Sequence, residues 1–194
     1  MNALKGLALL LLLVPVAGCG SSPKTHFFTL EATAPERSAP SRPVRPVQVV
    51  SIHLPPALDR RQMVSETGGG GLDVSDQNRW GGAFGDMIRR VLTQDLEKRL
   101  PKGTVIFPRE PAPAGTRRLV VDVLDFAGNG AGEVTFDGSW SLVASGADKP
   151  LLARHVQLHE SAAGPGYAGQ ARAMSRILGS LADQIAAALV QFEG

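Results

Sequence analysis

The sequence of 194 residues contains one cysteine, Cys19. A chain with a single cysteine forms no internal disulfide bond, and the same count excludes zinc sites built from several thiolates. Packing, hydrogen bonds and ion pairs must therefore hold the fold together. The one cysteine needs an explanation of its own.

The chain also lacks a strong excess of positive or negative charge. The chain has 20 Lys plus Arg residues against 18 Asp plus Glu residues, without a basic patch long enough to indicate nucleic-acid binding. We therefore expect no nucleic-acid partner. The most basic stretch, residues 37–45, is interleaved with prolines, which is typical of a solvated loop. Attraction of this stretch to anionic lipid head groups is the alternative.

The N-terminus has the order of an export signal. Lys5 gives the start a positive charge, and residues 7–14 form an unbroken apolar run. The span of roughly a dozen apolar residues is shorter than the about 20 that a transmembrane helix needs. We therefore interpret residues 1–18 as a signal peptide that is removed.

Small residues precede the cysteine in Val16-Ala17-Gly18-Cys19, which resembles the lipobox of bacterial lipoproteins. The resemblance implies a diacylglyceryl group on Cys19, cleavage before it, and acylation of the new amino terminus. Residues 19–26 then form an acylated tether. Gly20 stands where lipoproteins of the inner membrane commonly carry Asp, which implies the periplasmic face of the outer membrane. An ordinary secretory signal with an incidental cysteine is the alternative.

The remaining chain, residues 27–194, is long enough for one domain with its own core. Residues 31–46 are rich in proline, which predicts an extended loop. The tether of about seven residues reaches at most ~25 Å, so the domain lies close to the membrane. Residues with strand-forming patterns occupy 27–30, 47–54, 62–66, 72–74, 105–107, 118–126, 133–143 and 151–160.

Two amphipathic helices are also expected. Apolar residues recur every three or four positions over residues 80–96, with Ser75 or Asp76 as the N-cap, and over residues 171–192. The order of elements predicts an α+β fold, in which two helices pack on an antiparallel sheet of about five to seven strands. The last three strands suit a meander. In the alternative interpretation, the apolar face of the second helix binds a partner or lipid instead of packing on the sheet.

Patterns that indicate a metal or nucleotide site are weak. His155, His159 and Glu160 have a spacing that suits zinc on a helix, but on a strand the two rings lie about 13 Å apart. Residues 128–132 are rich in glycine, yet a strand follows them where a nucleotide loop needs a helix. They fit a hairpin turn.

Two aspartate pairs are candidates for acid–base chemistry, Asp122 with Asp125 and Asp73 with Asp76. Separations of three residues in exposed segments are common by chance. We therefore expect no catalytic residues, no metal, no cofactor and no enzymatic activity.

A motif in the middle of the chain carries a resemblance. The pattern is a strand ending in Leu-Pro, then Leu-Asp-Arg-Pro-Gln, an apolar residue and Val, then Arg-Trp, and later Trp-x-Leu. The matching residues are Leu54-Pro55, Leu58-Asp59-Arg60, Gln62-Met63-Val64, Arg79-Trp80 and Trp140-Ser141-Leu142. With the lipobox, they resemble the PqiC/YmbA family, the auxiliary lipoproteins of ABC-type transport systems that work with MCE proteins.

The chain departs from that pattern at two places. Arg61 stands where Pro is usual, and Gly81-Gly82-Ala83-Phe84 replaces Ala-Glu-Pro-Leu after the tryptophan. The two glycines weaken the start of the first helix by up to about 1 kcal/mol each, so that the helix can begin later than residue 80.

The resemblance implies a non-enzymatic outer-membrane lipoprotein that docks a periplasmic conduit for lipid transport. Its partners would be a PqiB-like MCE protein and, through it, an inner-membrane transporter, and a homo-oligomer is compatible with a tubular partner. One alternative is a structural lipoprotein of another envelope assembly, such as a secretion machine. Another is a lipid carrier with an internal cavity.

The motif residues are the candidate partner-binding site: Leu54, Pro55, Leu58, Asp59, Arg60, Gln62, Arg79 and Trp80. Physically, the prolines fix the exit from a strand, the second leucine returns to the core, and the Asp-Arg pair ties the turn. The alternative interpretation is that these residues shape a turn and contact no partner.

Overall fold

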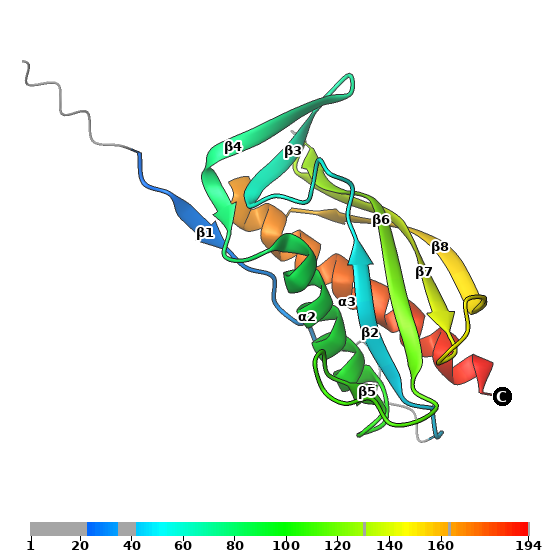
Figure 1. Cartoon of the computed structure of the whole chain (residues 1–194). Helices are drawn as coiled ribbons and strands as arrows, with labels where there is room; N and C mark the ends of the chain where they lie inside the picture. Colours follow the sequence, from blue (N-terminus) through cyan, green and yellow to red (C-terminus); the bar gives the residue numbers. More distant parts are fainter. Residues whose placement is uncertain (1–22, 35–41, 130, 163, 194) are drawn as a thin grey trace, which may run out of the picture.

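The computed structural model describes residues 23–34, 42–129, 131–162 and 164–193. One curled sheet carries both helices on one face, so the α+β class is confirmed (Figure 1). The strands are β1 (His26–Phe28), β2 (Val47–His53), β3 (Gln62–Gly68), β4 (Gly71–Trp80), β5 (Val105–Ile106), β6 (Arg117–Asn129), β7 (Glu133–Val143) and β8 (Pro150–Ser161). The helices are α2 (Phe84–Arg99) and α3 (Gly166–Phe192).

Strands β6, β7 and β8 form the antiparallel meander that the sequence predicts. Val121 of β6 lies opposite Trp140 of β7, which lies opposite Arg154 of β8. Along β7, every second residue from Val134 to Leu142 is buried, whereas the residues that alternate with them are partly exposed. This period of two is what a sheet with one covered face requires.

The sheet as a whole is mixed, so the prediction of an antiparallel sheet is wrong. β2 runs parallel to β5 and β6, and β1 runs parallel to the end of β4. The reason is the connection through α2, which returns the chain to the end of the sheet where β2 starts, so that Val47 pairs with Val105. Alternating apolar residues show which face a strand buries but not which way its neighbour runs.

Helix α2 starts at Phe84, four residues after the predicted start at Trp80. β4 continues as far as Trp80, so the predicted caps, Ser75 and Asp76, lie within this strand. Two glycines separate the strand from the helix, and the N-cap, Ala83, makes no side-chain hydrogen bond. The predicted start was wrong because a buried strand residue happens to fit the helical spacing.

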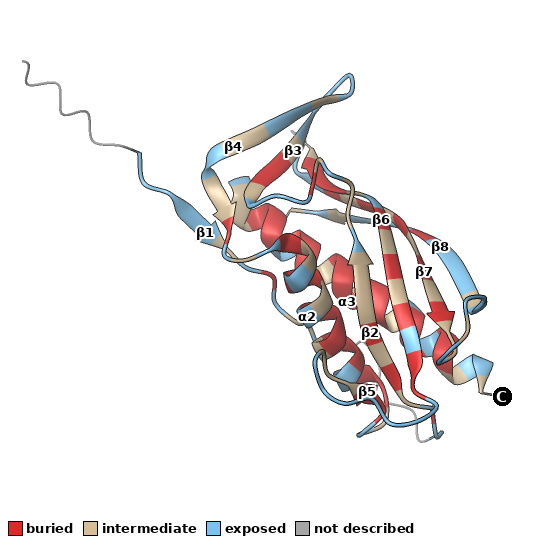
Figure 2. Cartoon of the chain, in the orientation of Figure 1, coloured by how far each residue is buried: buried red, intermediate tan, exposed pale blue. Residues whose placement is uncertain are grey.

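Helix α3 lies in the core. Among the described residues it is the one helix that is long and apolar enough to cross a membrane, but 67% of its apolar window is buried inside the fold. Most of its residues are buried (Figure 2), and the helix contacts α2 and the strands β7 and β8. The apolar face of α3 therefore packs in the core and is not free to bind a partner or lipid.

A row of aromatic rings joins β4, α2 and the meander. Trp80 stacks on Phe84 with ring centroids 4.7 Å apart, and Phe84 lies 5.9 Å from Phe126. Phe126 meets Phe136 edge-to-face at 5.3 Å. Such pairs contribute about 0.5–1.5 kcal/mol beyond their buried area, so they fix the start of α2 against the sheet.

A buried ion cluster holds the segment after β1 against both helices. The backbone N–H of Thr33 donates to Asp95 Oδ1 at 2.7 Å, and Arg99 Nη2 donates to the carbonyl of Ala34 at 3.1 Å. Arg99 also binds Asp183 on α3 through Nε and Nη2, at 2.9 and 3.0 Å. The N-terminal segment, α2 and α3 are therefore tied at one point.

Asp95 is the member of this cluster whose burial costs the most free energy. Its side chain is 0% exposed, and the side chain of Arg99, which lies 3.3 Å away, is 3% exposed. Burial raises the pKa of Asp95, against the hydrogen bond from the Thr33 backbone and the charge of Arg99. Its Oδ2 atom has no hydrogen-bond partner among the described residues. Without Arg99, the carboxylate would be an uncompensated buried charge.

The predicted proline-rich loop, residues 31–46, lies partly outside the described residues. Its first residues join the ion cluster, and Val44 is buried at 9% exposure. Both described ends of the loop are therefore packed on the domain.

We expect Arg99→Leu to destabilise the fold by about 3–5 kcal/mol, because it leaves Asp95 charged and unpaired. Urea denaturation measures the change. Since folding already raises the pKa of Asp95, the variant should regain stability as the pH falls through that pKa and the carboxyl becomes neutral.

The double variant Arg99→Leu with Asp95→Asn should recover part of the loss at neutral pH. Arg89→Leu is the control, because it removes only a surface pair with Asp86 on the same helix and should change stability by at most about 1 kcal/mol. Equal losses for Arg99→Leu and Arg89→Leu would contradict the role of the cluster.

Candidate docking surface

The first half of the motif forms a tight turn between β2 and β3. The carbonyl of Pro55 accepts the N–H groups of Leu58 and Asp59 at 2.9 and 3.1 Å. The N–H of Arg60 donates to the carbonyl of Leu58 at 2.8 Å. Leu58 is 6% exposed. The turn therefore points one apolar side chain back into the core, as the sequence indicates.

The second half of the motif meets the first across two strands. Gln62 at the start of β3 pairs with Arg79 near the end of β4, and the N–H of Trp80 donates to the carbonyl of Arg61 at 2.6 Å. Trp80 is 2% exposed. The structure thus brings the two parts of the motif together, but it places the tryptophan inside the core.

Leu54 belongs to the supporting residues as well. It is half-buried and packs on the core beside α2. A Cβ atom added to Gly85 would lie 3.4 Å from Leu54 Cδ1, so the glycine permits the close approach of the helix to this leucine. The other matching segment, around Trp140, lies in the buried meander at 1% exposure. These residues shape the turn and its support.

Asp59 and Arg60 are the motif residues that are fully exposed. Asp59 borders a hollow of about 260 Å³ at the start of α2, whose lining also contains Asp86 and Arg89. Side chains with mixed charge at a rigid turn can bind a protein by complementary ion pairs and hydrogen bonds. Of the predicted site residues, this pair is therefore the best placed to contact a partner.

The predicted lipidation site, Cys19, lies outside the described residues. The first described strand, β1, pairs with the end of β4, so that Phe27 lies opposite Arg79 and Phe28 opposite Trp80. Gly81 N–H donates to the carbonyl of Phe28 at 2.8 Å. The first described strand of the domain therefore adjoins the motif. Sequence reasoning missed this neighbourhood, because a strand of three residues gives no signal of its partner.

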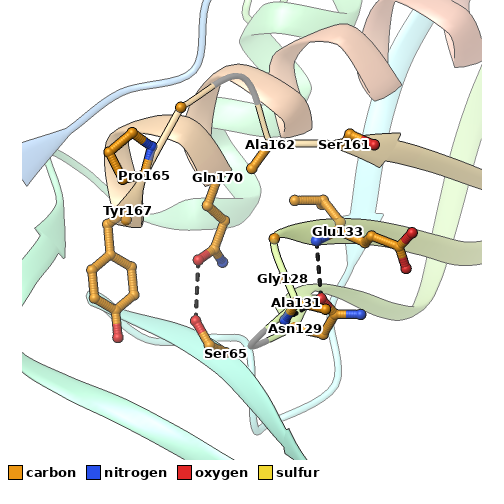
Figure 3. Close-up of a pocket in the computed structure, with 14 residues that line it drawn as sticks. Ser65, Gly128, Asn129, Ala131, Glu133, Ser161, Ala162, Pro165, Tyr167 and Gln170 are labelled. Atoms are coloured by element: carbon orange, nitrogen blue, oxygen red, sulfur yellow. Dashed lines mark hydrogen bonds between the residues drawn. The ribbon is translucent and has the colours of Figure 1, made fainter.

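A pocket of about 640 Å³ lies between β3, the turn from β6 to β7, and the start of α3 (Figure 3). Gln170 accepts a hydrogen bond from Ser65 Oγ at 3.1 Å and donates to the carbonyl of Val64 at 2.8 Å. A Cβ atom added to Gly128 would lie 2.9 Å from Gln170, so this glycine allows the close packing. Nothing in the sequence pattern predicted the pocket.

The pocket has few groups that could perform chemistry. Asn129 Oδ1 accepts the N–H groups of Ala131 and Glu133 at 3.0 and 2.9 Å, so it is used by the predicted hairpin turn (Figure 3). Glu133 is the one carboxylate among its described lining residues. A single carboxylate without a paired base or nucleophile does not favour catalysis at this site.

The histidines lie on the sheet as predicted, on exposed positions of β8. His155 Nε2 lies 3.2 Å from Asp137 Oδ1, and His159 Nδ1 lies 3.2 Å from Thr135 Oγ1. Over the part of the chain that the structure describes, no group of three metal-binding side chains occurs.

The aspartate pairs are not arranged as an acid–base pair. Asp122 binds His53 at 2.6 Å, and Tyr167 donates to Asp73 at 3.1 Å. Burial and the charge of Glu66 raise the pKa of Asp125. Each carboxylate therefore has its own structural environment.

The sequence matches the family model described as "ABC-type transport auxiliary lipoprotein component" over residues 28–186. A crystal structure of an uncharacterized protein has a TM-score of 0.65 and 20% identity, and covers 89% of this chain and 100% of that chain. A crystal structure of a Xanthomonas campestris protein has a TM-score of 0.69 and 16% identity, and covers 87% and 96%. At these identities, both show the fold alone. A comparison with curated proteins finds no match.

We expect Trp80→Ala to cost about 3–5 kcal/mol in the free energy of unfolding, because it leaves a cavity beside Phe84. Arg60→Ala, at an exposed position of the same motif, should change stability by less than about 0.5 kcal/mol. Urea denaturation of both variants tests the division into supporting and exposed residues. Similar losses for the two would contradict it.

Proposed function

Because the chain belongs to the family of ABC-type transport auxiliary lipoprotein components, we propose that it is the outer-membrane component of an MCE-type system that moves lipids across the envelope. It docks a periplasmic conduit made of a PqiB-like MCE protein, and through that conduit it connects to an inner-membrane transporter. It acts by binding rather than by catalysis.

One observation carries the proposal beyond the family description. The strand that follows the tether, β1, pairs with Arg79 and Trp80, and Gln62 of the motif turn pairs with Arg79 in turn. The strand that follows the tether and the exposed motif pair, Asp59 and Arg60, therefore lie on neighbouring, hydrogen-bonded segments. A protein that holds a conduit at a membrane needs its anchor and its docking surface on the same side.

The anchor in this proposal is Cys19, acylated after removal of residues 1–18. Each buried methylene of an acyl chain contributes about 0.8 kcal/mol, and two or more chains give stable attachment. Gly20, next to the cysteine, supports the periplasmic face of the outer membrane as the location. The domain would then dock its partner from this membrane.

We expect labelled palmitate to be incorporated into the wild-type chain and not into Cys19→Ala. Gel fluorography and mass spectrometry of the amino terminus measure the modification. Gly20→Asp should keep the acyl groups but move the protein from the outer-membrane to the inner-membrane fraction on a density gradient. Unmodified wild-type protein, or an unchanged fraction for Gly20→Asp, would contradict the anchor or the location respectively.

A pull-down of the acylated protein from detergent-solubilised envelopes should recover an MCE protein, identified by mass spectrometry. We expect Arg60→Glu to lose this partner, because the charge at the exposed turn is reversed while the core is untouched. Lys102→Glu is the matched control, since Lys102 is exposed in the turn before β5 and should retain the partner.

Recovery of a secretion assembly and no MCE protein would favour the alternative of a structural lipoprotein. If wild type and Arg60→Glu recovered the MCE protein equally, this protein would still be the partner, but the motif turn would be excluded as its binding site. Thermal unfolding of both variants confirms that each is folded.

A further inference from the structure

An aromatic side chain is exposed at the point where the tether enters the domain. Phe27, in the middle of β1, is 64% exposed, whereas Phe28 packs against the core. The two side chains point to opposite faces because they are neighbours on a strand. A single exposed apolar side chain is common on protein surfaces, so the neighbours of Phe27 and its place beside the tether decide what it can contact.

The position of Phe27 is fixed by the residues that follow it. Arg90 Nη2 donates to the carbonyl of Leu30 at 3.1 Å and to Thr29 Oγ1 at 3.2 Å. Leu30 is 1% exposed, and the carbonyl of Phe28 accepts a hydrogen bond from the N–H of Gly81, which directly follows β4. The ring is therefore presented by the rigid body of the domain and not by a free tail.

Basic residues occur on the segments that adjoin β1. Arg79 lies opposite Phe27 in the strand register, on the same face of the sheet. Lys24 is exposed two residues before β1, and Arg61 is exposed beside the end of β4. Residues 23–30 contain no acidic residue, and the first one that follows, Glu31, lines the groove beside Phe27. An exposed aromatic ring among cationic side chains is the chemistry of the interface between lipid head groups and acyl chains.

A groove with both apolar and charged lining residues adjoins the ring. Phe27 and Phe28 line a groove of about 520 Å³ between the N-terminal segment and the first turns of α3. Ala168 and Ala171 belong to the same lining. Small side chains on the helix leave room for an apolar group to lie beside the ring.

The tether limits how far this region can stand from the membrane. Cys19 and His26 are seven positions apart in the sequence, which is a reach of at most ~25 Å. α3 has 27 residues and is therefore about 40 Å long, with its carboxyl end at the far side of the molecule from β1 (Figure 1). The domain has one end that the anchor keeps close to lipid and another that extends away from it.

We propose that the tether corner, defined as Lys24, Phe27, Arg61 and Arg79, rests on the head groups of the bilayer that holds the acyl anchor. Phe27 inserts below the phosphates and the three cations face them, while α3 leads away from the membrane. This orientation rests on the proposed acylation of Cys19. It makes the anchor and the protein surface a two-point attachment, so the domain does not swing freely on its tether.

The test uses the acylated full chain in vesicles of phosphatidylethanolamine and phosphatidylglycerol, with Phe27→Trp as the probe. Phe192→Trp is the matched control, since Phe192 is 44% exposed at the far end of α3. Trp80 and Trp140, which are 2% and 1% exposed, give the same background in both variants. Brominated acyl chains in the vesicles quench tryptophan that lies at the bilayer interface.

We expect the added tryptophan fluorescence of Phe27→Trp to shift to shorter wavelength on vesicles and to be quenched by brominated lipid. The added fluorescence of Phe192→Trp should not be quenched. Adding Arg79→Glu to the Phe27→Trp chain should restore the lost emission. Equal quenching of both probes, or quenching of neither, would overturn the proposal. A shift without quenching would also overturn it, because protein rather than lipid would then cover the ring.

Flotation of the vesicles separates this surface from the anchor. Protein that floats with the vesicles while Phe27→Trp stays unquenched would leave the acyl anchor intact and exclude the tether corner. Protein that does not float would contradict the acyl anchor and, with it, the orientation that depends on it.

Discussion

The buried guanidinium of Arg99 is the interaction on which the arrangement of the domain depends. It binds Asp95 on its own helix, Asp183 on α3 and the carbonyl of Ala34 in the N-terminal segment. The sheet alone does not fix how these three parts sit, because only β1 of the N-terminal segment pairs with it. A charged group that is satisfied in one arrangement and unsatisfied in others penalises the alternatives strongly.

In the proposed function this constraint has a consequence, since the N-terminal segment then connects the domain to its acyl anchor. A lipid anchor on a free tail would let the domain adopt any orientation. Here the chain is tied to both helices within a few residues of β1, so the direction in which the tether leaves the body is set by the core. In the proposed orientation, the motif turn is held near the membrane surface, where a conduit that ends at that membrane would be met.

Much of the fold could be predicted from the sequence, because its longest elements bury one face with a clear period. The three strands of the meander and α3 are of this kind, and α3 extends to Phe192 as predicted. The parallel pairing of β2 and the extension of β4 to Trp80 could not be predicted. Both depend on partners distant in the sequence, and Trp80 fits a helical spacing while its backbone bonds to Arg61 in a strand. The pocket beside Gln170 likewise arises from three segments that carry no shared pattern.

The candidate site shows a different limit of sequence reasoning. A motif identifies residues that occur together, but the reason for their presence can be folding as well as binding. Leu58 and Trp80 are nearly inaccessible, so no partner contacts their side chains without unfolding the turn. Asp59 and Arg60 are exposed on the turn that those two residues hold in place. The motif therefore combines buried residues that stabilise the turn with two exposed residues that can contact a partner. If a substitution of a buried residue abolished partner binding, the result would reflect lost stability rather than lost recognition. Exposure is what separates the two roles, and it is a property of the folded chain that the motif's spacing does not contain.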